Sequence, residues 1–387
     1  MRFANYSFIF LLLIFIDDLF CRQPYNPPAL AGGVHYLVVD GTIISGNDST
    51  IIYLSRTQNV SDSTYNFFSV AETGALVSVI GANGDSYDLN EQSAGKYATN
   101  QLNLNNSELY RLKIITSNGS QYLSDDMPVR ITPPIDSVSW QSESEGVQIY
   151  VNTHDPQNNT RYYRWQYTET WEYHPADGSE YIYDPQDTTV IERDTNQMVS
   201  TCWQTNQSTD LLLGSSAKLS EDIIYEQPLI LIPSESQKLS VEYSILVRQY
   251  ALDASSFAFW QLLQQSTEQL GSLFDPQPSQ LTGNIHNVSN PNEPVLGFIS
   301  FATLQEQRIF IIRPPNWVYP IPIGCNLIRV GNTPDSLVLE YGLGGYAPVT
   351  GIIAPSSGAI VAYNSAVLSC VDCTLQGGTT TKPSFWP

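Results

Sequence analysis

The clearest chemical signal in this 387-residue sequence is its set of five cysteines. Cys370 and Cys373 have the spacing of zinc ligands or of a thiol redox pair, but a zinc ribbon needs a second close pair. A thioredoxin-like site needs a βαβ context, which the sequence also lacks. We therefore predict that Cys202, Cys325, Cys370 and Cys373 form structural disulfides of an exported chain, with all three complete pairings open. These bonds should fasten the C-terminal tail to the body.

The fifth cysteine, Cys21, follows the apolar run Phe8–Ile16. That run is too short for a membrane-spanning helix, which needs about 20 residues, and it suits a secretory signal. Cys21 stands where a bacterial lipoprotein carries its acylated residue, although residues 18–20 lack the small side chains usual there. We predict a lipid anchor at Cys21, with a tether over residues 22–33. The alternative is an ordinary cleaved signal that removes Cys21.

Glu169 is the carboxylate with the most unusual sequence context. It alternates with Tyr163, Trp165, Tyr167, Trp171 and Tyr173 along one side of a predicted strand over 161–173. A buried carboxylate needs a partner, and Arg248 on a predicted strand over 241–251 is our candidate. We favour this internal ion pair over a catalytic acid, because no second carboxylate has a defined place opposite Glu169.

Other chemistry finds little support in the sequence. Four scattered histidines share no motif, and no H-E-x-x-H, G-x-S-x-G or phosphate-binding loop occurs, so we predict no enzyme, no cofactor and no metal. The formal net charge is −21, which repels phosphate backbones and makes nucleic acid an unsuitable partner.

The pattern of strands and turns predicts a mainly β fold with one helix. Asp253 is placed as an N-cap, residues 254–270 have helical periodicity, and Gly271 has the position of a C-cap. Seven or so strands in 34–132, including a hairpin with Asn83-Gly84 at its turn, predict a β-sandwich that resembles the prealbumin-like or carboxypeptidase-regulatory-like fold.

The rest of the chain divides at Pro133-Pro134. Residues 134–312 predict a second, fibronectin-III-like sandwich, with the helix over 254–270 as an insertion. The tail over 313–387 has few strand signals, and we expect it to wrap the second domain. The complete division is a signal segment over 1–21, a tether over 22–33, two tandem sandwiches and a cysteine-bearing tail.

Several stretches together resemble one protein family. They are YLVVDG (36–41), LSRT (54–57), YYRW (162–165), ETWE (169–172), YSILVRQY (243–250), GSLFDPQP (271–278) and CVDCTLQGG (370–378). These are similar to the Bacteroidetes lipoprotein family with domain of unknown function 4249, over essentially the whole mature chain. The resemblance implies a cell-envelope lipoprotein of the outer membrane, on either its periplasmic or its surface side, encoded near TonB-dependent receptors.

From this resemblance we expect a non-catalytic lipoprotein that assists a TonB-dependent outer-membrane receptor by binding substrate or covering its mouth. The chain would meet the membrane through its lipid anchor only. Tyrosine and tryptophan are frequent, and these side chains favour interfaces. The alternatives are an adhesin or structural surface protein and, third, a β-sandwich hydrolase.

Overall fold

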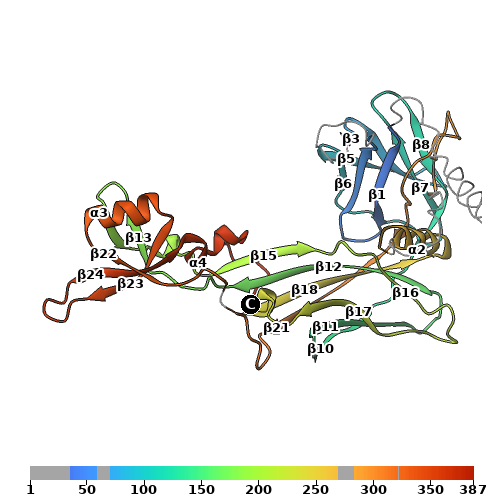
Figure 1. Ribbon diagram of the computed structural model, residues 1–387. Coiled ribbons are helices and arrows are strands. Elements are labelled where there is room, and N and C mark those ends of the chain that lie inside the picture. The colour runs from blue at the N-terminus through green and yellow to red at the C-terminus, as the bar shows by residue number, and fades with distance from the viewer. Residues whose placement is uncertain (1–34, 59–69, 269–282, 321) are drawn as a thin grey trace, which may run out of the picture.

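The computed structural model describes residues 35–58, 70–268, 283–320 and 322–387. The molecule is elongated, with a β-barrel and a smaller terminal lobe projecting from opposite ends of a β-sandwich (Figure 1). Strands account for 49% and helices for 12%, which confirms the predicted mainly β class. The predicted signal segment 1–21, the tether 22–33, the anchor Cys21 and the C-cap Gly271 lie outside the described residues. In the described part of the chain, no helix has the length and hydrophobicity needed to cross a bilayer.

Eight strands form a closed barrel in the order β7-β4-β5-β6-β2-β1-β20-β9, with β9 returning to β7. The barrel strands are β1 (Leu37–Ile44), β2 (Thr50–Arg56), β4 (Leu76–Gly81), β5 (Ser86–Ser93), β6 (Lys96–Thr99), β7 (Leu109–Ile115), β9 (Met127–Arg130) and β20 (Phe301–Ala302). Three further strands extend this sheet: β3 (Val70–Ala71), β8 (Gln121–Ser124) and β19 (Ile285–Asn287).

Alternation of apolar side chains positions the barrel core. Leu37 and Val39 on β1 and Ile52 and Leu54 on β2 point inward and are buried, as period-two patterning requires. The predicted hairpin is confirmed, since β4 pairs with β5 around Gly84, whose φ of 97° suits glycine.

The predicted sandwich over 34–132 is wrong, because these residues form a barrel that a distant segment completes. Phe301 and Ala302 pair in parallel with β1 on one side and with β9 on the other. Residues 285–302 therefore belong to the barrel and not to the second domain, where we expected them. The pairing satisfies backbone groups that β1 and β9 would otherwise expose as edges, and Phe301 fills the barrel core.

The second unit is a sandwich of a three-stranded and a five-stranded sheet. The smaller sheet contains β10 (Ile135–Glu143), β11 (Gly146–Asp155) and β17 (Asp222–Pro233). The larger contains β12 (Tyr162–Tyr173), β15 (Cys202–Gln207), β16 (Leu212–Ser215), β18 (Glu242–Leu252) and β21 (Leu304–Ile312), with the short helix η2 (Gln237–Leu239) beside it. The aromatic side chains of β12 face the space between the sheets and dominate its core.

Helix α2 (Ala254–Glu268) joins the barrel to the sandwich (Figure 1). The predicted N-cap is confirmed: Asp253 Oδ1 accepts from the backbone N–H of Ser256 at 2.8 Å. Phe259 and Trp260 pack into the barrel core, while Trp260 also lies under the guanidinium of Arg164 from β12, 4.1 Å from its ring centroid. The helix therefore buries its aromatic face between the two units.

The prediction that residues 313–387 wrap the sandwich is wrong for most of that tail, which builds a separate lobe with its own small cores. The lobe elements are β13 (Tyr181–Asp184), β14 (Thr189–Glu192), η1 (Thr195–Gln197), β22 (Ile328–Gly331), α3 (Pro334–Leu337), the π-helix η3 (Val338–Leu343), β23 (Tyr346–Ile353), β24 (Ile360–Val367) and α4 (Leu368–Val371). The tail meets the sandwich near its start, where Trp317 joins the sandwich core, and again from η4 (Cys373–Gln376) onward, where Thr379 bridges to Trp203. An inserted hairpin between β12 and β15 supplies β13 and β14, which the sequence pattern did not connect to the tail.

Candidate functional site

The structure places Glu169 inside the sandwich, where its side chain is 2% exposed. Its carboxylate accepts from Lys238 Nζ at 2.6 Å, Tyr243 Oη at 3.1 Å and Asn206 Nδ2 at 3.2 Å. Burial, and then the neighbouring Glu169, raise the pKa of Tyr243 well above its usual value, so the phenol stays a donor. Three donors therefore occupy this carboxylate, and its geometry is that of a structural group.

The predicted pair between Glu169 and Arg248 is wrong because the two side chains lie on opposite faces of one sheet. Arg248 stands opposite Gln166, whose side chain points away from the core, while Glu169 points inward. Arg248 instead binds Glu306 Oε1 at 2.7 Å and Thr168 Oγ1 at 2.9 Å on the outer face. The true partner, Lys238, comes from η2, a short helix that strand patterning could not identify.

A second buried carboxylate, Asp222, was not found by sequence reasoning. It accepts hydrogen bonds from Tyr163 Oη and Ser216 Oγ, and its own backbone N–H donates to Asn158 Oδ1 at 2.6 Å. Burial and then this carboxylate raise the pKa of Tyr163 far above its normal range. The Asp222 carboxylate links β12 to the start of β17. In the sequence, only the aromatic row that contains Tyr163 pointed to this part of the core.

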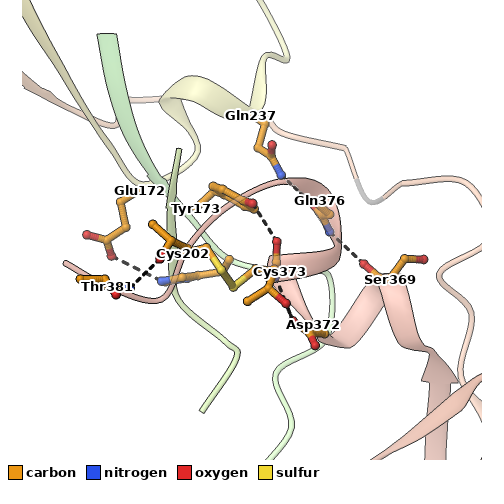
Figure 2. Close-up of a disulfide and its surroundings, with 12 residues drawn as sticks. Glu172, Tyr173, Cys202, Gln237, Ser369, Asp372, Cys373, Gln376 and Thr381 are labelled. Atoms are coloured by element: carbon orange, nitrogen blue, oxygen red, sulfur yellow. Dashed lines mark hydrogen bonds and ion pairs between the residues drawn. A yellow bond between two sulfur atoms is a disulfide. The ribbon is translucent and has the colours of Figure 1, made fainter. Parts of the chain in front are cut away.

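All four candidate cysteines form disulfides, as predicted, and the structure resolves their pairing. Cys202 joins Cys373, and Cys325 joins Cys370. The first bond attaches the end of the chain to the sandwich, and Tyr173 Oη donates to the carbonyl of Cys373 at 2.8 Å beside it (Figure 2). The second bond lies within the terminal lobe. The two close cysteines therefore serve different units.

A cleft of about 210 Å³ lies where the sandwich meets the terminal lobe. Four separate segments build it, and its lining residues are His174, Pro175, Ala176, Ser240, Val241, Arg313, Tyr319 and Pro322. Arg313 donates from Nε and Nη2 to the carbonyl of Trp317 at 3.1 and 2.7 Å, which holds the loop that carries Tyr319. The residues that line this hollow thus include a guanidinium, an imidazole and a phenol.

The terminal lobe also displays exposed apolar side chains. Val338, Leu339 and Leu343 on the π-helix η3, here called the η3 patch, are 40, 60 and 80% exposed. π-Helices are rare and occur often at functional sites. Large apolar groups that are exposed together mark interaction surfaces.

No group of three or more His, Cys, Asp or Glu side chains is arranged to hold a metal ion in the residues that the structure describes. The candidate sites are therefore a polar cleft and an apolar surface, both associated with the terminal lobe.

The architecture of barrel, sandwich and disulfide-linked lobe defines a mainly β protein with several units. The chain belongs to the family named Domain of unknown function (DUF4249), whose model matches residues 23–308. The family resemblance is thus confirmed, but the match ends at residue 308 and does not extend over the whole mature chain as we expected.

Two solved structures resemble this chain weakly. No curated protein matches this sequence. A two-domain fibronectin type III segment of chicken tenascin is 10% identical, with a TM-score of 0.16, covering 57% of this chain and 93% of that one. A candidate carbohydrate-binding protein of Bacteroides uniformis is 10% identical, with a TM-score of 0.15, covering 56% of this chain and 90% of that one. Scores this low carry no argument about function.

Proposed function

We propose that this protein is a non-catalytic lipoprotein of the bacterial outer membrane, anchored at Cys21, that serves a TonB-dependent receptor as an accessory or substrate-binding component. The sequence resemblance to lipoproteins encoded near TonB-dependent receptors suggests this function, while the family itself is named only as one of unknown function. The two disulfides support an extracytoplasmic location, where such bonds persist. The occupied state of Glu169 supports a non-catalytic role for the sandwich interior.

The observation that carries the receptor-docking role is the contrast between an acidic chain and its C-terminal segment, which has no net charge. Residues 313–387 hold three acidic and three basic residues, so the net charge of −21 lies entirely before them. Most of the lobe's acidic groups come from the inserted segment around β13 and β14, while Asp335 and Glu340 lie in α3 and η3. The η3 patch lies on this net-neutral segment, where burying its apolar side chains against a partner is favourable.

The position of the lobe also favours a protein partner over the membrane surface. The described chain begins in the barrel, and the lobe lies at the far end of the sandwich (Figure 1). An anchor joined to the barrel would keep the barrel near the bilayer and leave the lobe free to meet a receptor. The acidic body would also be repelled by anionic lipid headgroups.

Capture from native outer membranes tests this proposal. The tagged full-length protein should co-purify a TonB-dependent receptor, and Leu339→Glu with Leu343→Glu should abolish that capture, since two charges cannot enter an apolar interface without cost. The matched control is Leu76→Glu with Leu219→Glu, which places two charges on the barrel and sandwich at positions 70 and 55% exposed. Capture by wild type and control but not by the η3 variant supports docking through the patch.

Equal capture by all three proteins, or no receptor in any of them, would overturn the docking role. Labelling with a palmitate analogue tests the anchor separately: Cys21→Ala should lose the label. Unchanged labelling of that variant would rule out acylation at Cys21. A deletion strain that loses surface attachment but retains nutrient uptake would instead indicate an adhesin.

A further inference from the structure

We propose that the cleft between sandwich and terminal lobe binds a small hydroxylated carboxylate, such as a sugar acid. This deepens the substrate-binding part of the proposed function by naming a ligand class. Its volume of about 210 Å³ gives room for one monosaccharide-sized molecule.

The charge of the cleft favours an anion. Arg313 forms no ion pair with any residue that the structure describes, and the carbonyl of Trp317 fixes it through Nε and Nη2. A guanidinium has five N–H donors, so others stay available for a carboxylate. A planar guanidinium matches a carboxylate in geometry as well as in charge.

The remaining polar groups suit hydroxyls. Tyr319 and His174 line the same hollow, and each can donate or accept. His174 Nε2 lies 3.6 Å from Glu172 Oε1, which leaves Nδ1 for a ligand.

The walls of the cleft are held firmly, as a binding site requires. The backbone N–H of Arg313 donates to Val241 O at 3.0 Å, and Trp317 Nε1 donates to Ser236 O at 3.1 Å. Trp317 itself is 9% exposed and packs with the sandwich core. Preorganised donors lose less freedom when a ligand binds.

Titration calorimetry on the purified protein tests the site, with D-galacturonate as the probe and neutral D-galactose as its matched control. Galacturonate should bind saturably and galactose at least about tenfold more weakly, because hydrogen bonds to a charged group are the stronger ones. Arg313→Gln should weaken galacturonate binding by about tenfold or more, for the same reason. Arg329→Gln, which removes an exposed positive charge elsewhere in the lobe, should leave binding unchanged.

Because Arg313 also braces the Trp317 loop, Tyr319→Phe provides an independent variant that keeps the brace and removes one polar group from the cleft. It should reduce galacturonate affinity severalfold while circular dichroism stays that of wild type. Equal binding of the two sugars, undiminished binding by both variants, absence of galacturonate binding, or preference for inorganic phosphate would each overturn the proposal. No receptor is needed in this assay and no η3 residue lines the cleft, so docking and ligand binding can fail separately.

Discussion

The sandwich and the terminal lobe achieve order by different means. The sandwich buries a continuous core of large aromatic and aliphatic side chains, whereas the lobe has two small clusters and a disulfide of its own. Small cores bury too little apolar surface to fold independently, and covalent links compensate for this. The sandwich is therefore the more stable unit, and the lobe depends on the Cys325–Cys370 disulfide. Because the lobe needs little of its surface for a core, more of that surface can contact a partner.

Removing the central aromatic of the sandwich should have the largest effect. Trp165 is fully buried, donates from Nε1 to Gln249 Oε1 at 2.8 Å and stacks on Tyr163. Trp165→Ala should lower the free energy of unfolding by about 3–5 kcal/mol in a urea titration. Trp140→Ala, at a site that is 38% exposed, is the control and should cost less than about 1 kcal/mol. Similar losses in both variants would show that the sandwich core is not the base of stability.

Loss of the lobe disulfide should come next. Cys325→Ser with Cys370→Ser opens a link across 45 residues and should destabilise the lobe by about 2–4 kcal/mol. Amide hydrogen exchange should quicken across residues 322–372 while β12 and β18 keep their protection. The pair Cys202→Ser with Cys373→Ser is the comparison, and should loosen the end of the chain instead. Uniform acceleration through the sandwich would contradict the separation of the two units.

The smallest effect concerns the two ion pairs of the larger sheet. Glu169→Gln should cost about 2 kcal/mol in the free energy of unfolding, because the variant leaves Lys238 unpaired beside the core. Glu306→Gln should cost at most about 1 kcal/mol, since its pair with Arg248 is about one-third exposed and screened by water. The midpoints of urea unfolding, measured at low and high salt, distinguish the two pairs, because salt screens the exposed pair more than the buried one. Equal costs would mean that burial does not distinguish the pairs.

Features set by neighbouring residues could be predicted from the sequence. The N-cap of α2, the hairpin at Gly84 and the inward face of β12 each follow from local geometry and periodicity. The even number of cysteines after Cys21 also gave the disulfide candidates correctly. The cap, the hairpin and the strand face depend on contacts between residues close in sequence. The disulfide candidates depend only on the residue type.

Features set by distant contacts could not be predicted. Lys238 reaches Glu169 from an irregular segment, and no strand pattern encodes such an approach. The cleft around Arg313 combines four segments, one of them in a Pro-rich stretch with no periodicity. Phe301 pairs in parallel with β1 and β9 because the folded barrel leaves a space between these two strands, and the sequence does not show that they lie near each other.

That late-arriving strand has a consequence for biogenesis. The barrel cannot close until Phe301 and Ala302 have been synthesised. Until then β1 and β9 are edge strands of an incomplete sheet. Pairing between strands that are distant in sequence is slow, and the unpaired edges can meanwhile bind other chains. A fragment truncated near residue 132 would therefore keep the edges of β1 and β9 unpaired and should self-associate.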